Sequence, residues 1–250
     1  GWQIPSQKIN AWICPTWHPA ALLHRNNYDR EDEGNAVRRL FFEQHIKAAC
    51  ELEGRPWDEV PDYRSQVKVV YDHEKAARMI DRLAAGSRPV AIDIECNTLK
   101  PDSPESEIYS CAMSDGITTV SFPWLGKAIQ SVKAFIVSSV PKVGFNIKYE
   151  SRFFKAKLGV WVNNWVWDGM LASHVLDNRG GISSLAFQEF VLLGYYHKDE
   201  VTEYLKSDGS NTKNRIKEAP LEKLLMYGGL DALLEFHVAM KQSVKMGVQL

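Results

Sequence analysis

The run PVAIDIECNTLKP, from Pro89 to Pro101, places two acidic residues inside an otherwise apolar stretch that is typical of a core β-strand. Side chains alternate between the two faces of an extended strand. One face therefore carries Val90, Ile92, Ile94 and Cys96, and the other carries Ala91, Asp93 and Glu95. A carboxylate that is removed from water without a partner is unstable or becomes protonated. The strand predicts that Asp93 and Glu95 face water, pair with basic side chains, or bind a divalent cation, for which hard oxygen ligands are suited.

The elements around this strand predict an α/β domain with a mixed sheet flanked by helices. Two strands that turn at Asp115-Gly116 read as a hairpin. Further strands are expected over residues 67–71, 140–145 and 161–168, and helices over 72–85, 128–140, 146–159, 168–178 and 221–242. Asp72 and Asp168 are expected to cap the helices that they precede. Residues 195–220 are polar and weakly periodic, which predicts a mobile loop with at most one short helix.

The first part of the chain differs from the rest. It is rich in Trp and contains one amphipathic stretch, residues 36–53, before a proline-containing linker at residues 55–65. We therefore expect a small helical N-terminal appendage, residues 1–62, and a main domain, residues 63–250. The chain has no apolar run of the roughly 20 residues that a membrane span needs, and its four cysteines show no C-x-x-C pairing. These features predict a cytoplasmic location without a membrane partner.

Two further segments carry acids that could join Asp93 and Glu95. In GFNIKYESRFF, Asn146 is placed to cap a helix and Glu150 lies one turn in, near the positive end of the helix dipole. In YGGLDALLEFHV, Tyr227 and Asp231 are four residues apart and share a helix face. Taken singly, the first segment is also compatible with a capped surface helix, and the second with a hydrogen-bonded Tyr–Asp pair. Asp168 is a rival acid, for which a helix N-cap is the favoured role.

Together the three segments resemble the motifs of the Asp-Glu-Asp-Asp (DEDD) superfamily of 3′–5′ exonucleases. The tyrosine-bearing branch fits, as in the proofreading domain of family A DNA polymerases and its phage relatives. Motif one would be Asp93 and Glu95, motif two would run from Asn146 to Glu150, and motif three would be Tyr227 and Asp231. This resemblance implies a ribonuclease H-like fold. One position departs from the family pattern, because Glu150 stands where an Asp is usual.

The resemblance also implies the chemistry. Two Mg²⁺ or Mn²⁺ ions would supply the nucleophile and stabilise the leaving 3′-oxygen. Asp93 would bridge both ions, Glu95 and Asp231 would complete one site, and Glu150 would serve the other through water. Tyr227 would orient the attacking water by a hydrogen bond.

The expected substrate is single-stranded DNA or a frayed 3′ end. The nucleic-acid-binding residues implied are Thr98 and Leu99 at the terminal base and sugar, Asn146 at the terminal nucleotide, and Lys148. Lys148 belongs to a positive strip that also contains Lys142, Arg152, Lys155 and Lys157. The strip is equally compatible with phosphate binding and with a solvated helix face. The net charge of −1 argues against a protein that coats duplex nucleic acid.

The function expected from these residues is a two-metal 3′–5′ exonuclease acting on DNA in phage replication, proofreading or repair, with a polymerase domain or subunit as partner. Two alternatives stay open: a nucleic-acid-binding module whose catalysis is weakened through Glu150, and a 3′–5′ exonuclease that trims RNA. Separately, residues 13–26 resemble the late His-Pro-Ala/Ser motif of the uracil-DNA glycosylase superfamily, with His18 as the motif histidine. The upstream glycosylase segment is missing from this sequence, so we expect no glycosylase activity.

Overall fold

The computed structural model describes residues 2–23, 33–196, 201–207, 209 and 212–250. The chain divides into two compact units. The larger contains Asp62–Gln188 and His197–Leu250, and the smaller contains Gly1–Pro61 and Glu189–Tyr196. The division into domains of residues 1–62 and 63–250 stays a prediction. The two compact units do not follow it throughout, because residues 189–196 group with the smaller unit.

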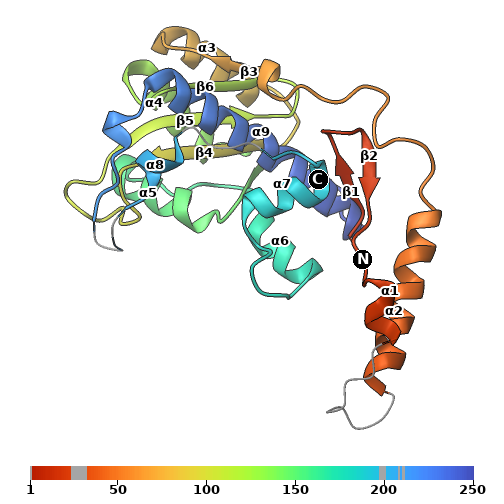
Figure 1. The fold of residues 1–250 in the computed structure, drawn as a ribbon. Coiled ribbons are helices and arrows are strands. Elements are labelled where there is room, and N and C mark those ends of the chain that lie inside the picture. Colours follow the sequence, from red (N-terminus) through yellow and green to blue (C-terminus); the bar gives the residue numbers. More distant parts are fainter. Residues whose placement is uncertain (1, 24–32, 197–200, 208, 210–211) are drawn as a thin grey trace. The chain divides into compact units, whose positions relative to one another are not determined.

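A six-stranded mixed sheet forms the centre of the larger unit, in the order β3-β6-β5-β4-β7-β8 (Figure 1). The strands are β3 (Val67–Val69), β4 (Val90–Cys96), β5 (Ile108–Ser114), β6 (Thr119–Pro123), β7 (Lys142–Gly144) and β8 (Trp165–Asp168). β5 pairs antiparallel with β4 and β6, whereas the pairs β3–β6, β4–β7 and β7–β8 are parallel. This arrangement confirms the predicted fold class and places the acidic strand β4 inside the sheet.

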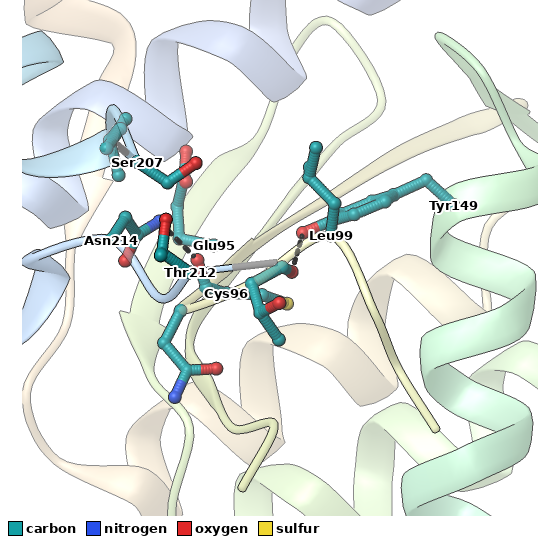
Figure 2. Close-up of a pocket in the computed structure, with 10 residues that line it drawn as sticks. Glu95, Cys96, Leu99, Tyr149, Ser207, Thr212 and Asn214 are labelled. Carbon is teal, nitrogen blue, oxygen red and sulfur yellow. Dashed lines mark hydrogen bonds between the residues drawn. The ribbon is translucent and has the colours of Figure 1, made fainter. Parts of the chain in front are cut away.

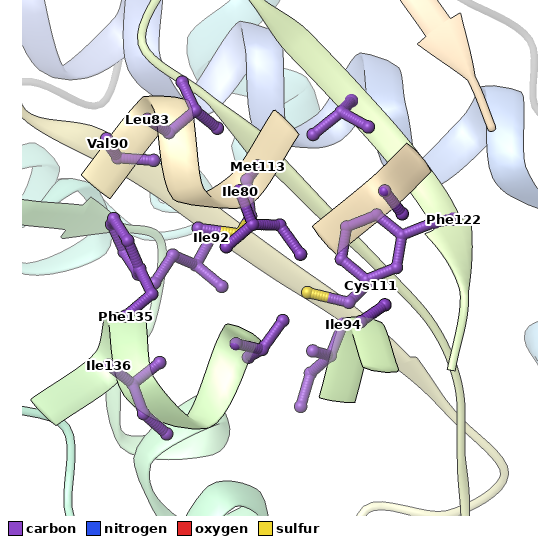
Figure 3. Close-up of a cluster of buried hydrophobic side chains, with 14 of the residues drawn as sticks. Ile80, Leu83, Val90, Ile92, Ile94, Cys111, Met113, Phe122, Phe135 and Ile136 are labelled. Carbon is purple, nitrogen blue, oxygen red and sulfur yellow. The ribbon is translucent and has the colours of Figure 1, made fainter. Parts of the chain in front are cut away.

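Helices cover both faces of the sheet. The helices of the larger unit are α3 (His73–Ala84), α4 (Gly126–Val137), α5 (Lys148–Leu158), α6 (Gly169–Leu176), α8 (Thr202–Leu205) and α9 (Leu221–Lys245), while α7 (Leu185–Leu193) contributes residues to both units. Apolar side chains of α3, α4 and α5 pack on one face and form the main core (Figure 3). α9 crosses the other face, where it contacts β3, β4, β5, β6 and β7.

The predicted alternation along β4 is confirmed by this packing. Val90, Ile92, Ile94 and Cys96 all belong to the main core. Ala91 lies on the opposite face, where it packs with Phe236 and Ala239 of α9. Asp93 and Glu95 share the face of Ala91 because they follow it at intervals of two residues. The acids therefore lie on the side of the sheet that α9 covers.

Small side chains let α9 approach the sheet closely. Cross-strand pairing places Ala112 of β5 beside Asp93 and Ser110 of β5 beside Glu95. Ser121 of β6 pairs with Ala112 in turn. A Cβ atom built on Gly229 of α9 would lie 3.2 Å from the Ser121 Cβ atom and only 2.3 Å from the Val67 Cγ1 atom. The helix can therefore occupy this position only with glycine at the point of contact.

Most predicted helix ends agree with the structure. Asp72 caps α3, because its carboxylate accepts a hydrogen bond of 2.6 Å from the Lys75 N–H. α5 ends at Leu158 and is followed by Gly159 in the C-cap position, with a φ of +75°. The described part of residues 195–220 is more structured than predicted, since it contains both α8 and a 3₁₀ turn at Ile216–Glu218.

Lys142 was expected on a positive surface strip, and this prediction is wrong. The side chain is fully buried, and its Nζ atom donates hydrogen bonds to the Val140 and Ser138 carbonyls at 2.7 and 2.9 Å. Burial lowers the pKa of Lys142 from 10.5 to about 8. Lys142 therefore has a structural role, since it binds the carbonyl groups that follow α4, and it is not available to bind phosphate.

The described part of the smaller unit contains α1 (Pro19–Leu23), α2 (Glu33–Cys50), the end of α7, and an antiparallel strand pair, β1 (Ile4–Ser6) and β2 (Ala11–Ile13). The helices agree with the predicted helical appendage, but the strand pair was not predicted. Just before α1, the His18 Nδ1 atom accepts a hydrogen bond from the Ala20 N–H. The last residues of the glycosylase-like stretch, 24–26, lie outside the described residues. In the described part of the chain, no helix combines the length and hydropathy that a membrane span requires.

Candidate active site

Three carboxylates from two segments that are distant in the sequence meet between β4 and α9. Asp93, Glu95 and Asp231 each offer one oxygen atom, and these atoms all lie within 4.8 Å of one another. Asp93 and Glu95 come from β4, whereas Asp231 comes from the middle of α9. The structure therefore brings together three of the four acids that the sequence predicts as metal ligands.

The position of α9 explains this convergence. Tyr227 and Asp231 lie one helical turn apart and project from the same side of the helix. Gly228 lies in the same turn, where a Cβ atom would be 3.5 Å from the Asp93 Oδ2 atom and 3.6 Å from the Glu95 Cγ atom. The backbone of α9 thus passes directly over the two strand acids. Asp231 reaches them because no side chain at position 228 intervenes.

The electrostatics of the cluster suit a divalent cation. Glu95 and Asp231 are each only 9% exposed, and the Asp93 Oδ2 atom is buried without a hydrogen-bond partner among the described residues. Burial raises the pKa of Asp93 to about 7. Carboxylate oxygens are preferred ligands of Mg²⁺ and similar hard cations. The cluster therefore fits a metal ion, whose positive charge would offset the repulsion among the three neighbouring carboxylates.

Glu150 lies beside this cluster but does not belong to it. Its side chain is 4% exposed in the first turn of α5, and its Oε2 atom has no hydrogen-bond partner among the described residues. Burial raises the pKa of Glu150 well above its ordinary value, and the charges of Asp93 and Asp168 raise it further. The predicted set of four acids is thus found as a group of three with Glu150 as a neighbour.

Asp168 has the structural role that the sequence favoured. Its Oδ1 atom accepts hydrogen bonds from the N–H groups of Met170 and Leu171, which caps α6. The same carboxylate also accepts from the N–H groups of Asn146 and Ile147, at 3.0 and 3.3 Å. Asp168 therefore stabilises two helix entries at once.

The predicted cap at Asn146 is wrong. Helix α5 begins at Lys148 with Ile147 in the N-cap position, and no side chain forms the cap bond. Asn146 instead has a φ of +67°, a conformation that Asn tolerates better than most residues. Asp168 supplies the acceptor for this loop from the neighbouring strand. A local sequence pattern could not reveal an acceptor 22 residues away.

We expect Asp168→Ala to lower the free energy of unfolding by about 2–4 kcal/mol, because two helix entries lose their acceptor. Asp168→Asn should cost less, since it retains the oxygen that serves most of these bonds. Urea unfolding measures both variants, with Asp72→Ala as a control that removes a single cap and should cost about 1 kcal/mol. Equal losses for Asp168→Ala and Asp72→Ala would contradict the double role of Asp168.

A pocket of about 210 Å³ opens beside Glu95. It is lined by Glu95, Cys96, Asn97, Thr98, Leu99, Tyr149, Leu205, Ser207, Thr212 and Asn214 (Figure 2). Thr98 and Leu99 thus line a pocket beside Glu95, and Leu99 is 70% exposed. The other two predicted nucleic-acid-binding residues are not among the lining residues. Asn146 lies in the loop before α5, and Lys148 is exposed on α5.

Sequence reasoning missed one wall of this pocket. Ser207, Thr212 and Asn214 come from the polar stretch that was expected to be a mobile loop. The Asn214 Nδ2 atom donates a hydrogen bond to the Cys96 carbonyl across 118 positions of the chain. No periodicity or local motif in this stretch indicates such a contact. Only the fold brings the two segments together.

Residues 67–245 match the sequence model of a 3′–5′ exonuclease family. A search of curated protein sequences found no match. Solved structures share the fold at low sequence identity. RNase D of Escherichia coli, an exoribonuclease involved in structured RNA processing, has a TM-score of 0.55 at 13% identity, over 72% of this chain and 45% of that one.

Two further structures show the same likeness. The catalytic core of RRP6 from Trypanosoma brucei has a TM-score of 0.53 at 15% identity, over 72% of this chain and 47% of that one. The Pol1 structure of M. smegmatis, in complex with DNA primer-template and dNTP, has a TM-score of 0.53 at 12% identity, over 72% of this chain and 28% of that one. This chain therefore spans less than half of each of these three relatives.

Proposed function

The chain belongs to the 3′–5′ exonuclease family, and from this premise we propose that it removes nucleotides from the 3′ ends of DNA. Asp93, Glu95 and Asp231 would hold the divalent cations. The convergence of these three carboxylates within 4.8 Å is the observation that carries the proposal. Family membership supports hydrolysis and metal dependence, whereas DNA as substrate and the role of each residue are proposed here.

A pair of Mg²⁺ or Mn²⁺ ions would supply a nucleophile at neutral pH and stabilise the leaving 3′-oxygen. Asp93 would bridge both ions, since its Oδ2 atom is buried under α9 without another partner among the described residues. Glu95 and Asp231 would complete the ligand set, and Glu150 would act from outside it through water. Tyr227 would orient the attacking water, since it lies on the same helix face as Asp231.

The pocket beside Glu95 would receive the terminal nucleotide. Leu99 offers an exposed apolar side chain on which a base can stack without sequence preference. Thr98 would contact the sugar, whereas Asn146 and Lys148 would contact the substrate from outside this pocket. Solved structures with this fold include RNA-processing enzymes as well as a DNA polymerase, so RNA is the second candidate substrate.

We expect a 5′-labelled DNA single strand, incubated with Mn²⁺ or Mg²⁺, to give a ladder that shortens from the 3′ end and disappears with EDTA. The same assay on RNA of identical sequence compares the two candidate substrates. Faster trimming of RNA would replace DNA by RNA in the proposal. Binding of both strands without a ladder would instead favour a module whose catalysis is weakened through Glu150.

The biological setting is also a proposal. A role in replication, proofreading or repair, a polymerase domain or subunit as partner, a phage origin and a cytoplasmic location would all agree with an exonuclease of this kind. The glycosylase-like stretch around His18 would then be a remnant without glycosylase activity. The hydrogen bond from the Ala20 N–H to the His18 ring supports the plainer alternative, a histidine that stabilises the start of α1.

A further inference from the structure

We propose that Asn214 is a positioning residue that sets the geometry of the terminal-nucleotide pocket. Its side chain joins the described residues 212–219 to the end of β4, directly after the proposed metal ligand Glu95. The inference rests on the proposed function, because it assigns a substrate-binding consequence to this pocket. Asn214 lines the pocket and is not one of the three carboxylates of the cluster.

The end of β4 needs such a support. The register between β4 and β5 shifts between Glu95 and Cys96, so regular pairing is interrupted immediately after the acid. Asn214 contacts the backbone at this point. Its Nδ2 atom donates to the Cys96 carbonyl and its backbone N–H donates to the Asn97 carbonyl, both at 2.9 Å. The position of the strand end therefore depends on Asn214 as well as on β5.

Contacts on either side of residues 208–211 hold the described parts of 201–219 in place, namely 201–207 and 212–219. Val201 and Ile216 are each only 1% exposed. The Asn214 Oδ1 atom accepts a hydrogen bond from the Ile216 N–H at 3.2 Å, and the Arg215 N–H donates to the Tyr204 carbonyl at 2.8 Å. These contacts fix the backbone directly after Asn214 and tie it to Tyr204.

The opposite side of the pocket is held independently. The Tyr149 hydroxyl donates a hydrogen bond to the Thr98 carbonyl at 3.4 Å. Figure 2 shows Leu99 and Tyr149 on one side, with Ser207, Thr212 and Asn214 on the other. The segment that follows Glu95 is thus supported by Tyr149 from α5 and by Asn214 from residues 201–219. The width of the pocket depends on both supports.

Other links between these segments are weaker. Lys213 pairs with Glu105, and Lys217 pairs with Glu107, but all four side chains are exposed. Exposed ion pairs contribute little, and salt screens them further. The Asn214 amide is a neutral donor to a carbonyl of the buried residue Cys96. Its removal would leave that carbonyl without this donor, and the two pocket-lining segments that the hydrogen bond joins could then move apart.

The test compares Asn214→Ala with the wild-type chain. We expect the Kd for a 5′-labelled single strand, measured by fluorescence anisotropy with Ca²⁺ in place of Mn²⁺, to rise at least about 10-fold, because small displacements of a binding site have large effects. The KM for hydrolysis should rise by a similar factor while kcat changes less than about threefold. The Kd for Mn²⁺ alone, measured by calorimetry, should stay within about twofold.

Asn163→Ala is the matched control. The Asn163 amide also donates to backbone carbonyls, those of Val137 and Ser138 at 3.5 Å, but it does not line the pocket. It should leave the strand Kd and KM unchanged. If Asn214→Ala does not fold, Asn214→Asp removes the donor while retaining the acceptor for Ile216. Its weaker binding should then persist at 300 mM salt, where a purely electrostatic effect would fade.

Unchanged strand affinity and KM in a folded Asn214 variant would overturn the inference. A fall in Mn²⁺ affinity of 10-fold or more would also overturn it, because Asn214 would then act on the carboxylates. Failure of the proposed function is distinguishable. A wild-type chain that binds the strand but gives no ladder defeats the exonuclease proposal, whereas the effect of Asn214→Ala on binding in Ca²⁺ still decides the inference.

Discussion

Replacing Asp93 by asparagine is expected to lower the rate of 3′ trimming by at least about 10³-fold while the fold survives. The expected loss is large because residues that act as one catalytic unit fail together when one is removed. Asp93 is one of the three acids of the carboxylate cluster, and an amide lacks the negative charge that a divalent cation requires. The ladder assay with Mn²⁺ measures the rate, and circular dichroism verifies the fold.

The same variant should be more stable than the wild-type chain when no metal is present. The Asp93 Oδ2 atom is buried without a hydrogen-bond partner among the described residues, and an unpaired buried carboxylate lowers stability. A neutral amide of the same shape removes that penalty, so we expect a gain of about 1–2 kcal/mol, or roughly 2–8 °C in Tm for a domain of this size. Conversely, Mn²⁺ should raise the Tm of the wild-type chain, because a ligand of the native state stabilises it. It should not raise the Tm of the variant.

Asp102→Asn is the control for these measurements. Asp102 is an exposed acid that pairs with Arg152 at 2.8 Å, and loss of an exposed pair should change neither activity nor Tm appreciably. Retention of more than a tenth of the wild-type rate in Asp93→Asn would contradict the proposed role of Asp93. A lower Tm without metal, combined with an unchanged response to Mn²⁺, would contradict the placement of the cation.

The carboxylate cluster could be predicted because its signals are local. Alternation along a strand reports which side chains share a face, and a spacing of four reports the same for a helix. Asp93, Glu95, Tyr227 and Asp231 were found from these two periods and from the family motifs that they form. The mixed sheet was predictable for a similar reason, since short apolar strands and amphipathic helices each have their own period.

The remaining features depend on contacts between distant segments. Lys142 looked like a surface cation until the fold buried its Nζ atom against the Val140 carbonyl. Asn146 looked like a helix cap, but Asp168 provides the acceptor. Asn214 gave no sequence signal, because its partner Cys96 belongs to a strand more than a hundred residues earlier. Hydrogen bonds of this kind carry no periodicity that a single sequence could reveal.

The two adjacent glycines of α9 provide the sharpest test of how the helix meets the sheet. A Cβ atom on Gly229 would lie 2.3 Å from the Val67 Cγ1 atom, whereas one on Gly228 would have its nearest contact at 3.5 Å, with the Asp93 Oδ2 atom. The first distance is a steric overlap, and the second is an ordinary contact. Alanine is also the better helix former by about 1 kcal/mol, so the same substitution should have opposite effects at the two positions.

We expect Gly229→Ala to lower the free energy of unfolding by about 3 kcal/mol, because overlap in a packed core forces α9 away from the sheet. Gly228→Ala should retain or raise stability but weaken Mn²⁺ binding, since its methyl group lies against the acids. Urea unfolding and Mn²⁺ calorimetry separate the two effects. Val67→Ala provides the decisive cycle: alone it should destabilise by creating a cavity, but in the Gly229→Ala background it should restore stability by removing the overlapping Cγ1 atom. Additive losses in the double variant would contradict this explanation, because they would show that overlap with the Val67 side chain is not the reason that position 229 requires glycine.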